Sequence, residues 1–180
     1  TRFAHLRCEI CRRYNADDMF EAGFDDPVKI RIKGDFAHTT DRIFVVSDRF
    51  SEVLKTSNAE GFELKPLGAS GWNALRITRY VACDDNVVTT TGPWCPACGR
   101  ADEAFGTFRR RSQIHESDLC NTFFGTEKTW PLSGCDREIL LTEDLVKTLK
   151  TAGVKGGYCC RLYTDEEWAQ SEAYKKTRYR

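Results

Sequence analysis

Two Cys-x-x-Cys pairs in this chain have the spacing of metal ligands. Cys8 and Cys11 form the first pair, Cys95 and Cys98 form the second, and 87 residues (95 − 8) separate the two. The two thiolates of each pair can converge on one ion, and two pairs supply the four sulfurs of a closed tetrahedral zinc site. The sequence therefore predicts one structural Zn²⁺ that ties the N-terminal end of the chain to its middle.

Two other interpretations of these cysteines stay open. The Trp-Cys-Pro-Ala-Cys segment around Cys95 is similar to the active-site motif of thioredoxin-like enzymes, in which a helix N-terminus lowers the pKa of the first thiol. Gly-Pro before this segment and Gly99 after it disfavour such a helix. The other alternative is a set of purely structural thiols. The histidines could replace a sulfur ligand, although a solvated or core role is more usual for them: His5, His38 and His115.

The bulk composition indicates a globular protein without a strong charge. Lys plus Arg equals Asp plus Glu, with 27 of each, so the chain lacks the basic surplus of a typical nucleic-acid binder. Nine cysteines are an odd number, and the first ten residues lack the apolar core of a signal peptide. No apolar run approaches the length that spans a bilayer. We therefore expect a cytoplasmic protein with neither a nucleic-acid partner nor a membrane.

The chain also contains an internal repeat. A shift of 95 positions (136 − 41) places residues 136–162 over residues 41–67. Each copy opens with an apolar run too short for a helix and closes with a second such run, which is typical of buried strands. The four predicted strands are residues 43–46 and 62–67 in the first copy, and residues 139–141 and 158–163 in the second.

A helix is predicted between the two strands of each copy. Ser47 and Thr142 offer hydroxyl N-caps, and acidic residues follow them in the first turn, where the helix dipole favours negative charge. Asn58 and Gly153 are the residue types that most easily adopt the left-handed conformation that ends a helix. Apolar residues with helical spacing lie between these ends: Phe50, Val53 and Leu54 in the first copy, Leu145 and Leu149 in the second.

These patterns predict an α+β (mixed α/β) fold made of two pseudo-repeated lobes. Each lobe would hold one cysteine knuckle and one strand-helix-strand unit, and the zinc site would join them. The N-terminal lobe is predicted over residues 1–92, with the unit 41–67 and a further strand over 74–83. The C-terminal lobe is predicted over residues 93–180, with the unit 136–163 and a polar C-terminal helix.

Further local patterns complete this expectation. Alternating apolar and basic residues predict a half-exposed strand over residues 28–33. Residues 68–71 and 89–93 read as loops. The polar helix after Asp165 is expected to be anchored by Trp168.

No recognised catalytic motif occurs in the chain, so we expect no enzyme. A site with four sulfur ligands would leave no open position for water or substrate. The acidic pairs Asp17-Asp18 and Asp84-Asp85 are explained by solvated turns. The basic run at residues 109–111 indicates either a solvated stretch or a patch that meets a protein partner.

The chain resembles a bacterial family named for its double CxxCG motif, which includes immunity proteins that neutralise toxins delivered between cells. The resemblance covers nearly the whole chain and rests on both cysteine pairs, on Cys-Pro-x-Cys-Gly at residues 95–99 and on the two repeated units. The family's cysteines carry over to Cys8, Cys11, Cys95 and Cys98, while Arg12 replaces the glycine of the first motif.

The resemblance implies an immunity protein that binds a cognate toxin domain in the cytoplasm and blocks its active site. An ADP-ribosyltransferase and a nuclease are both reasonable targets. Residue types that are enriched at interfaces lie in segments predicted to be loops or variable: Trp72, Phe123, Phe124, Trp130 and residues 109–111. The alternative function is a zinc-ribbon-like adaptor that binds nucleic acid or regulates another protein.

Overall fold

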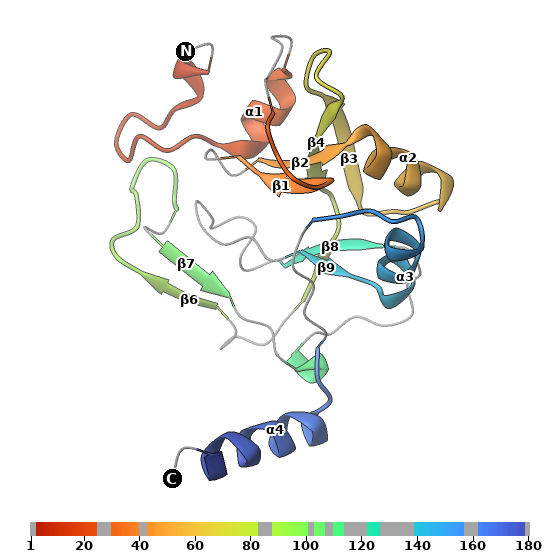
Figure 1. Ribbon diagram of the computed structural model, residues 1–180. Coiled ribbons are helices and arrows are strands. Elements are labelled where there is room, and N and C mark those ends of the chain that lie inside the picture. The colour runs from red at the N-terminus through yellow and green to blue at the C-terminus, as the bar shows by residue number, and fades with distance from the viewer. Residues whose placement is uncertain are drawn as a thin grey trace.

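The computed structural model of the protein has the mixed α+β architecture that the sequence predicts (Figure 1). It describes residues 3–24, 30–39, 43–82, 88–100, 103–106, 110–113, 122–126, 139–156 and 162–178. The helices are η1 (Ala4–Leu6), α1 (Ala16–Ala22), α2 (Asp48–Thr56), η3 (Arg111–Gln113), α3 (Glu143–Thr151) and α4 (Asp165–Arg178). The strands are β1 (Phe36–His38), β2 (Phe44–Ser47), β3 (Phe62–Pro66), β4 (Trp72–Ile77), β5 (Tyr80–Val81), β6 (Val88–Thr91), β7 (Glu103–Gly106), β8 (Phe123–Thr126) and β9 (Leu140–Leu141).

The main sheet is antiparallel and has the strand order β1-β2-β4-β3. Since β2 and β3 both pair antiparallel with β4, they run parallel to each other with β4 between them. The predicted strand-helix-strand unit of the first copy is thus a split β-α-β crossover through α2. A smaller sheet has the order β5-β8-β9, and β6 and β7 form a separate hairpin. Figure 1 shows α4 projecting from the rest of the chain beyond η3.

One apolar cluster joins both copies of the repeat. Buried residues of the main sheet and of α2 share it with α3. The buried members are Phe44, Val46, Phe50, Leu54, Leu75, Ile77, Leu145 and Leu149. The division into lobes at residues 1–92 and 93–180 stays a prediction, which the double variant Leu54→Ala/Leu149→Ala can test.

The ends of α2 and α3 have the same hydrogen bonds at positions 95 residues apart (142 − 47). The hydroxyls of Ser47 and Thr142 accept from the amides of Phe50 and Leu145, at 3.1 and 3.4 Å. At the other end Asn58 and Gly153 have φ of 52° and 67°, and the next amide in each copy donates to the carbonyl of Leu54 or Leu149. The predicted starts and ends of both helices are confirmed.

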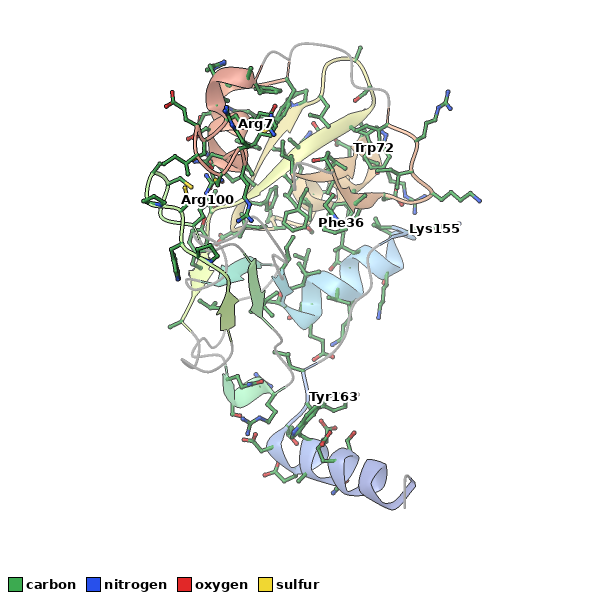
Figure 2. The ribbon with its side chains drawn as sticks, turned by 90° about the vertical axis from the view of Figure 1, so that its left-hand side faces the viewer. Arg7, Phe36, Trp72, Arg100, Lys155 and Tyr163 are labelled. Atoms are coloured by element: carbon green, nitrogen blue, oxygen red, sulfur yellow. The ribbon has the colours of Figure 1, made fainter. Side chains whose placement is uncertain are left out.

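Asp35 connects the two copies through a half-buried polar contact. Its carboxylate accepts from the Ser47 hydroxyl and from the Lys155 amide, each at 2.7 Å. The next residue, Phe36, lies beside the loop that holds Lys155 and Gly156 (Figure 2). A Cβ on Gly156 would lie 3.0 Å from the Phe36 carbonyl oxygen. Because φ of Gly156 is also +99°, only glycine allows this close approach of the backbones without strain.

This contact predicts a stability that depends on pH. Burial acts to raise the pKa of Asp35, but the hydrogen bonds from Lys155 and Ser47 outweigh it and lower the pKa below its usual 3.8. The ionised carboxylate therefore stabilises the fold above about pH 4, and this stability is lost as the pH falls through the lower pKa of the folded state. We expect Asp35→Asn to reduce the free energy of unfolding by about 1–2 kcal/mol at pH 7.

The measurement is urea unfolding of both proteins in EDTA from pH 7 to pH 2.5. The difference between wild type and Asp35→Asn should shrink steadily below pH 4. A difference that is constant over this range would show that the charge of Asp35 has no part in it.

Several strand predictions were wrong at particular residues. Of the strand predicted over 28–33, only residues 30–33 are described, and they form no strand. The strand that pairs with β2 at this edge is β1, which begins at Phe36. The strand predicted over 74–83 ends at Ile77, where its ladder with β3 ends, and β5 then pairs with β8 instead. Residues 89–91 belong to β6 rather than to a loop, and Trp72 lies in β4. Of the predicted strand 158–163, only 162–163 are described, and Tyr163 bridges Arg110.

The C-terminal helix is confirmed as α4. Thr164 and Glu167 form a capping box, in which each side chain accepts from the other residue's amide, at 3.2 and 3.0 Å. The Trp168 ring lies 6.0 Å from that of Tyr163. Arg110, from the basic run, forms an ion pair with Asp165 at 3.2 Å, which attaches η3 to α4. In the described part of the chain, no helix is both long enough and apolar enough to cross a bilayer.

Candidate metal centre

The first cysteine knuckle is a tight turn after η1. The Arg12 amide donates to the Cys8 carbonyl, and the Cys8 amide donates to the Arg13 carbonyl, both at 2.9 Å. The Sγ of Cys8 also accepts from the backbone amides of Ile10 and Cys11. Such a turn aims amide dipoles at one sulfur, which stabilises it as a thiolate.

The second knuckle repeats this geometry in the loop between β6 and β7. The Gly99 amide donates to the Cys95 carbonyl, and the Cys95 amide donates to the Arg100 carbonyl, both at 2.8 Å. The Sγ of Cys95 accepts from the amides of Ala97 and Cys98. Cys95 is followed by this turn and then by β7, whereas the thioredoxin-like interpretation requires a helix that begins at the motif.

The two knuckles bring the four predicted sulfurs together. The Cys8 and Cys95 sulfurs lie 3.7 Å apart and the Cys11 and Cys98 sulfurs 3.6 Å apart. All four sulfurs lie within 4.8 Å of one another. A tetrahedral ion with Zn–S bonds of 2.3 Å requires sulfurs about 3.8 Å apart, whereas a disulfide requires about 2 Å. The cluster therefore has the dimensions of a metal site, and its four cysteines are free thiols.

The electrostatics of the cluster differ between its sulfurs. The Cys98 amide, followed by that of Ala97, outweighs burial and lowers the pKa of Cys95 to about 6. The amides of Cys11 and Ile10 lower the pKa of Cys8 in the same way. Burial raises the pKa of the Cys98 thiol to about 11. A bound cation would hold all four as thiolates, because metal ligation removes their protons.

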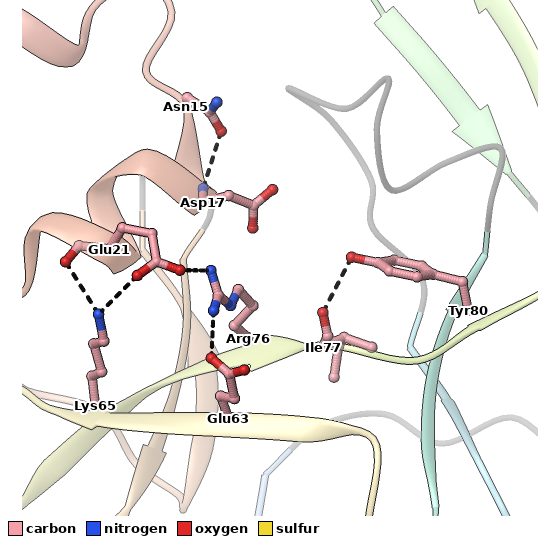
Figure 3. Close-up of polar contacts among 8 residues, drawn as sticks. All are labelled: Asn15, Asp17, Glu21, Glu63, Lys65, Arg76, Ile77 and Tyr80. Carbon is pink, nitrogen blue, oxygen red and sulfur yellow. Dashed lines mark hydrogen bonds and ion pairs between the residues drawn. The ribbon is translucent and has the colours of Figure 1, made fainter.

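The first knuckle is fixed to the body of the protein through Tyr14 and α1. Tyr14 forms a bridge with Arg7 and packs against a buried cluster that includes Met19 and Phe20 of α1. The next residue, Asn15, caps α1 by accepting from the Asp17 amide at 3.1 Å (Figure 3).

Ion pairs hold α1 on the main sheet. Figure 3 shows Glu21 of α1 between Lys65 of β3 and Arg76 of β4. Arg76 also pairs with Glu63. The charged groups of Lys65 and Arg76 lie over the Phe20 ring, 4.9 Å and 4.6 Å from its centroid. The Arg76 side chain, followed by Lys65, lowers the pKa of Glu21.

The remaining candidate residues lie elsewhere or outside the described residues. His5 and His38 are exposed, and neither belongs to the cluster of four cysteines. Asp17 and Asp18 lie in the first turn of α1, so they complement its dipole rather than forming a turn in solvent. His115, Trp130 and the pair at 84–85 lie outside the described residues.

Comparison with known proteins identifies no relative. No family model matches the chain, and neither a curated protein nor a solved structure matches it.

Arg12 adopts the backbone conformation that suits glycine. Its φ is 59°, and the equivalent Gly99 has a φ of 66°. A residue with a Cβ pays roughly 1–2 kcal/mol in this region, whereas glycine loses about 0.5–1 kcal/mol more chain entropy on folding. We therefore expect Arg12→Gly to stabilise the protein by about 0.5–1 kcal/mol, measured from the denaturant midpoint.

The matched control is Gly99→Ala in the other knuckle. A Cβ at Gly99 has no atom within 4 Å, so any effect comes from φ alone. This variant should be destabilised by a similar amount. If Arg12→Gly and Gly99→Ala changed the free energy of unfolding in the same direction, the explanation by backbone strain would be wrong.

Proposed function

We propose that the protein binds one structural Zn²⁺ through Cys8, Cys11, Cys95 and Cys98. The observation that carries this proposal is the gathering of four free thiols, from two similar knuckles, within 4.8 Å of one another. Four thiolates favour soft or borderline ions, of which zinc and iron are the usual occupants of such sites. Metal analysis of purified protein should find about one zinc per chain, and iron instead of zinc would refute the assignment.

Around this centre, we propose a non-catalytic protein that works by contact. A cation with four sulfur ligands has a complete coordination shell, so it supplies stability rather than a place for substrate. Residues of both knuckles leave apolar side chains in solvent, with Trp94 50% and Ile10 60% exposed. Exposed aromatic and aliphatic side chains beside a rigid element suit a protein partner.

The resemblance to the double CxxCG family suggests which partner this is. We propose that the protein is an immunity protein that binds a cognate bacterial toxin domain in the cytoplasm and blocks its active site. Support comes from the paired knuckles, in which Arg12 has the conformation of the glycine that it replaces. The two helices that the repeated units predict add to this support.

The test is expression of the toxin domain encoded next to this gene, with and without this protein. Growth should be restored, and a catalytically dead toxin should co-purify with the protein at a fixed ratio. An unrelated zinc-binding protein at the same level serves as the control. Failure of both rescue and complex formation would refute the immunity proposal, and salt-sensitive retention on nucleic acid would favour the adaptor instead.

A further inference from the structure

Besides the sulfur contacts, a side-chain hydrogen bond from Arg100 links the second knuckle to the segment just after the first. Its guanidinium donates from Nη1 to the Tyr14 carbonyl at 2.7 Å, across 86 residues of sequence. Arg100 is half-buried, so solvent screens this bond less than a surface contact. Figure 2 shows Arg100 and Arg7 on the same side of the molecule.

The backbone of Arg100 takes part in the second knuckle at the same time. Its carbonyl accepts from the Cys95 amide at 2.8 Å, and its amide donates to the Sγ of Cys98. Arg100 thus contacts the backbone of Cys95 and the thiol of Cys98. Through Tyr14 it also contacts the segment that follows the first knuckle.

Tyr14 is a firm anchor for this contact. It lies directly after the first knuckle, bridges Arg7 and packs on the apolar cluster under α1. The Arg7 guanidinium lies 5.6 Å from the centre of the Tyr14 ring. The second knuckle, in contrast, lies in the loop of the β6–β7 hairpin, which pairs with no other strand among the described residues.

We propose that Arg100 is a positioning residue that preassembles the metal centre, holding the second pair of thiols against the first before the ion arrives. The proposal depends on metal binding by the four cysteines. Groups that orient metal ligands commonly change metal affinity 10- to 100-fold when they are removed. Without the guanidinium, the ion itself would have to order the hairpin. The free-energy cost of that ordering would weaken zinc binding.

The test is the zinc affinity of the full chain, measured by competition with a chromophoric chelator at pH 7. Arg100→Met keeps the length of the side chain but removes its donors, and should bind zinc 10- to 100-fold more weakly. Arg100→Lys retains one possible donor and should recover part of the loss. The fraction folded is measured by circular dichroism in each sample, so that unfolding is not mistaken for weaker binding.

Arg12→Met is the matched control, because it removes one positive charge from the other knuckle, where the described contacts of Arg12 are those of its backbone. Its affinity should stay within about threefold of wild type. If Arg12→Met and Arg100→Met weaken binding equally, the effect is general electrostatics and the proposal is wrong. If Arg100→Met binds like wild type, the proposal is also wrong, whereas a wild type without zinc affinity would instead refute the metal centre itself.

Discussion

Cys95→Ser is expected to abolish stoichiometric zinc binding and to lower the melting temperature of the purified protein by more than 10 °C. Cys95 is buried, with 8% of its surface exposed, and its sulfur lies 3.7 Å from that of Cys8. Binding of structural zinc to thiolates contributes about 10–16 kcal/mol in small domains, so losing one of four ligands removes a large part of the stability. Differential scanning calorimetry and metal analysis of the same sample measure both effects.

The matched control for this substitution is Ala97→Ser in the same turn. Ala97 is exposed, and the change adds a hydroxyl while keeping all four thiols and the amide that Cys95 accepts from. Its zinc content and melting temperature should equal those of wild type. Adding a strong chelator to wild type should reproduce the Cys95→Ser result, and metal-free wild type with an unchanged melting temperature would contradict a structural role for the ion.

The features that the sequence predicted well are those encoded by neighbouring residues. Ser47 and Thr142 cap their helices, and Asn58 and Gly153 end them, because capping depends on side chains and φ values within a few positions. The cysteine cluster was also predictable, since two CxxC pairs leave few other uses for four thiols.

Strand pairing was less predictable because it depends on distant partners. Apolar and basic residues alternate over 28–33, yet the described residues 30–33 form no strand and β1 is the strand that pairs with β2. Likewise, the threonines at 89–91 resemble a loop next to Gly92 but pair with β7. Arg100 gave no local signal at all, because its donor reaches a carbonyl 86 residues away.

The second large effect is expected in the core that the two copies share. Leu54 of α2 has 0% of its surface exposed, and Leu149, its equivalent in α3, has 7%. Both belong to one cluster, and α2 packs against α3. We expect Leu54→Ala and Leu149→Ala each to lower the free energy of unfolding by about 2–5 kcal/mol, measured by urea denaturation. Lys55 is exposed in the same helix as Leu54. The control Lys55→Ala should change the free energy of unfolding by less than about 0.5 kcal/mol.

The double variant Leu54→Ala/Leu149→Ala tests whether the two copies unfold together. Side chains in one cluster share neighbours that can relax into the space left by either, so their effects should deviate from additivity by about 0.5–3 kcal/mol. The zinc-loaded double variant should still unfold in one transition if the shared cluster couples the copies. Strict additivity with two separate transitions would instead show that residues 1–92 and 93–180 unfold as independent lobes linked only by the metal centre.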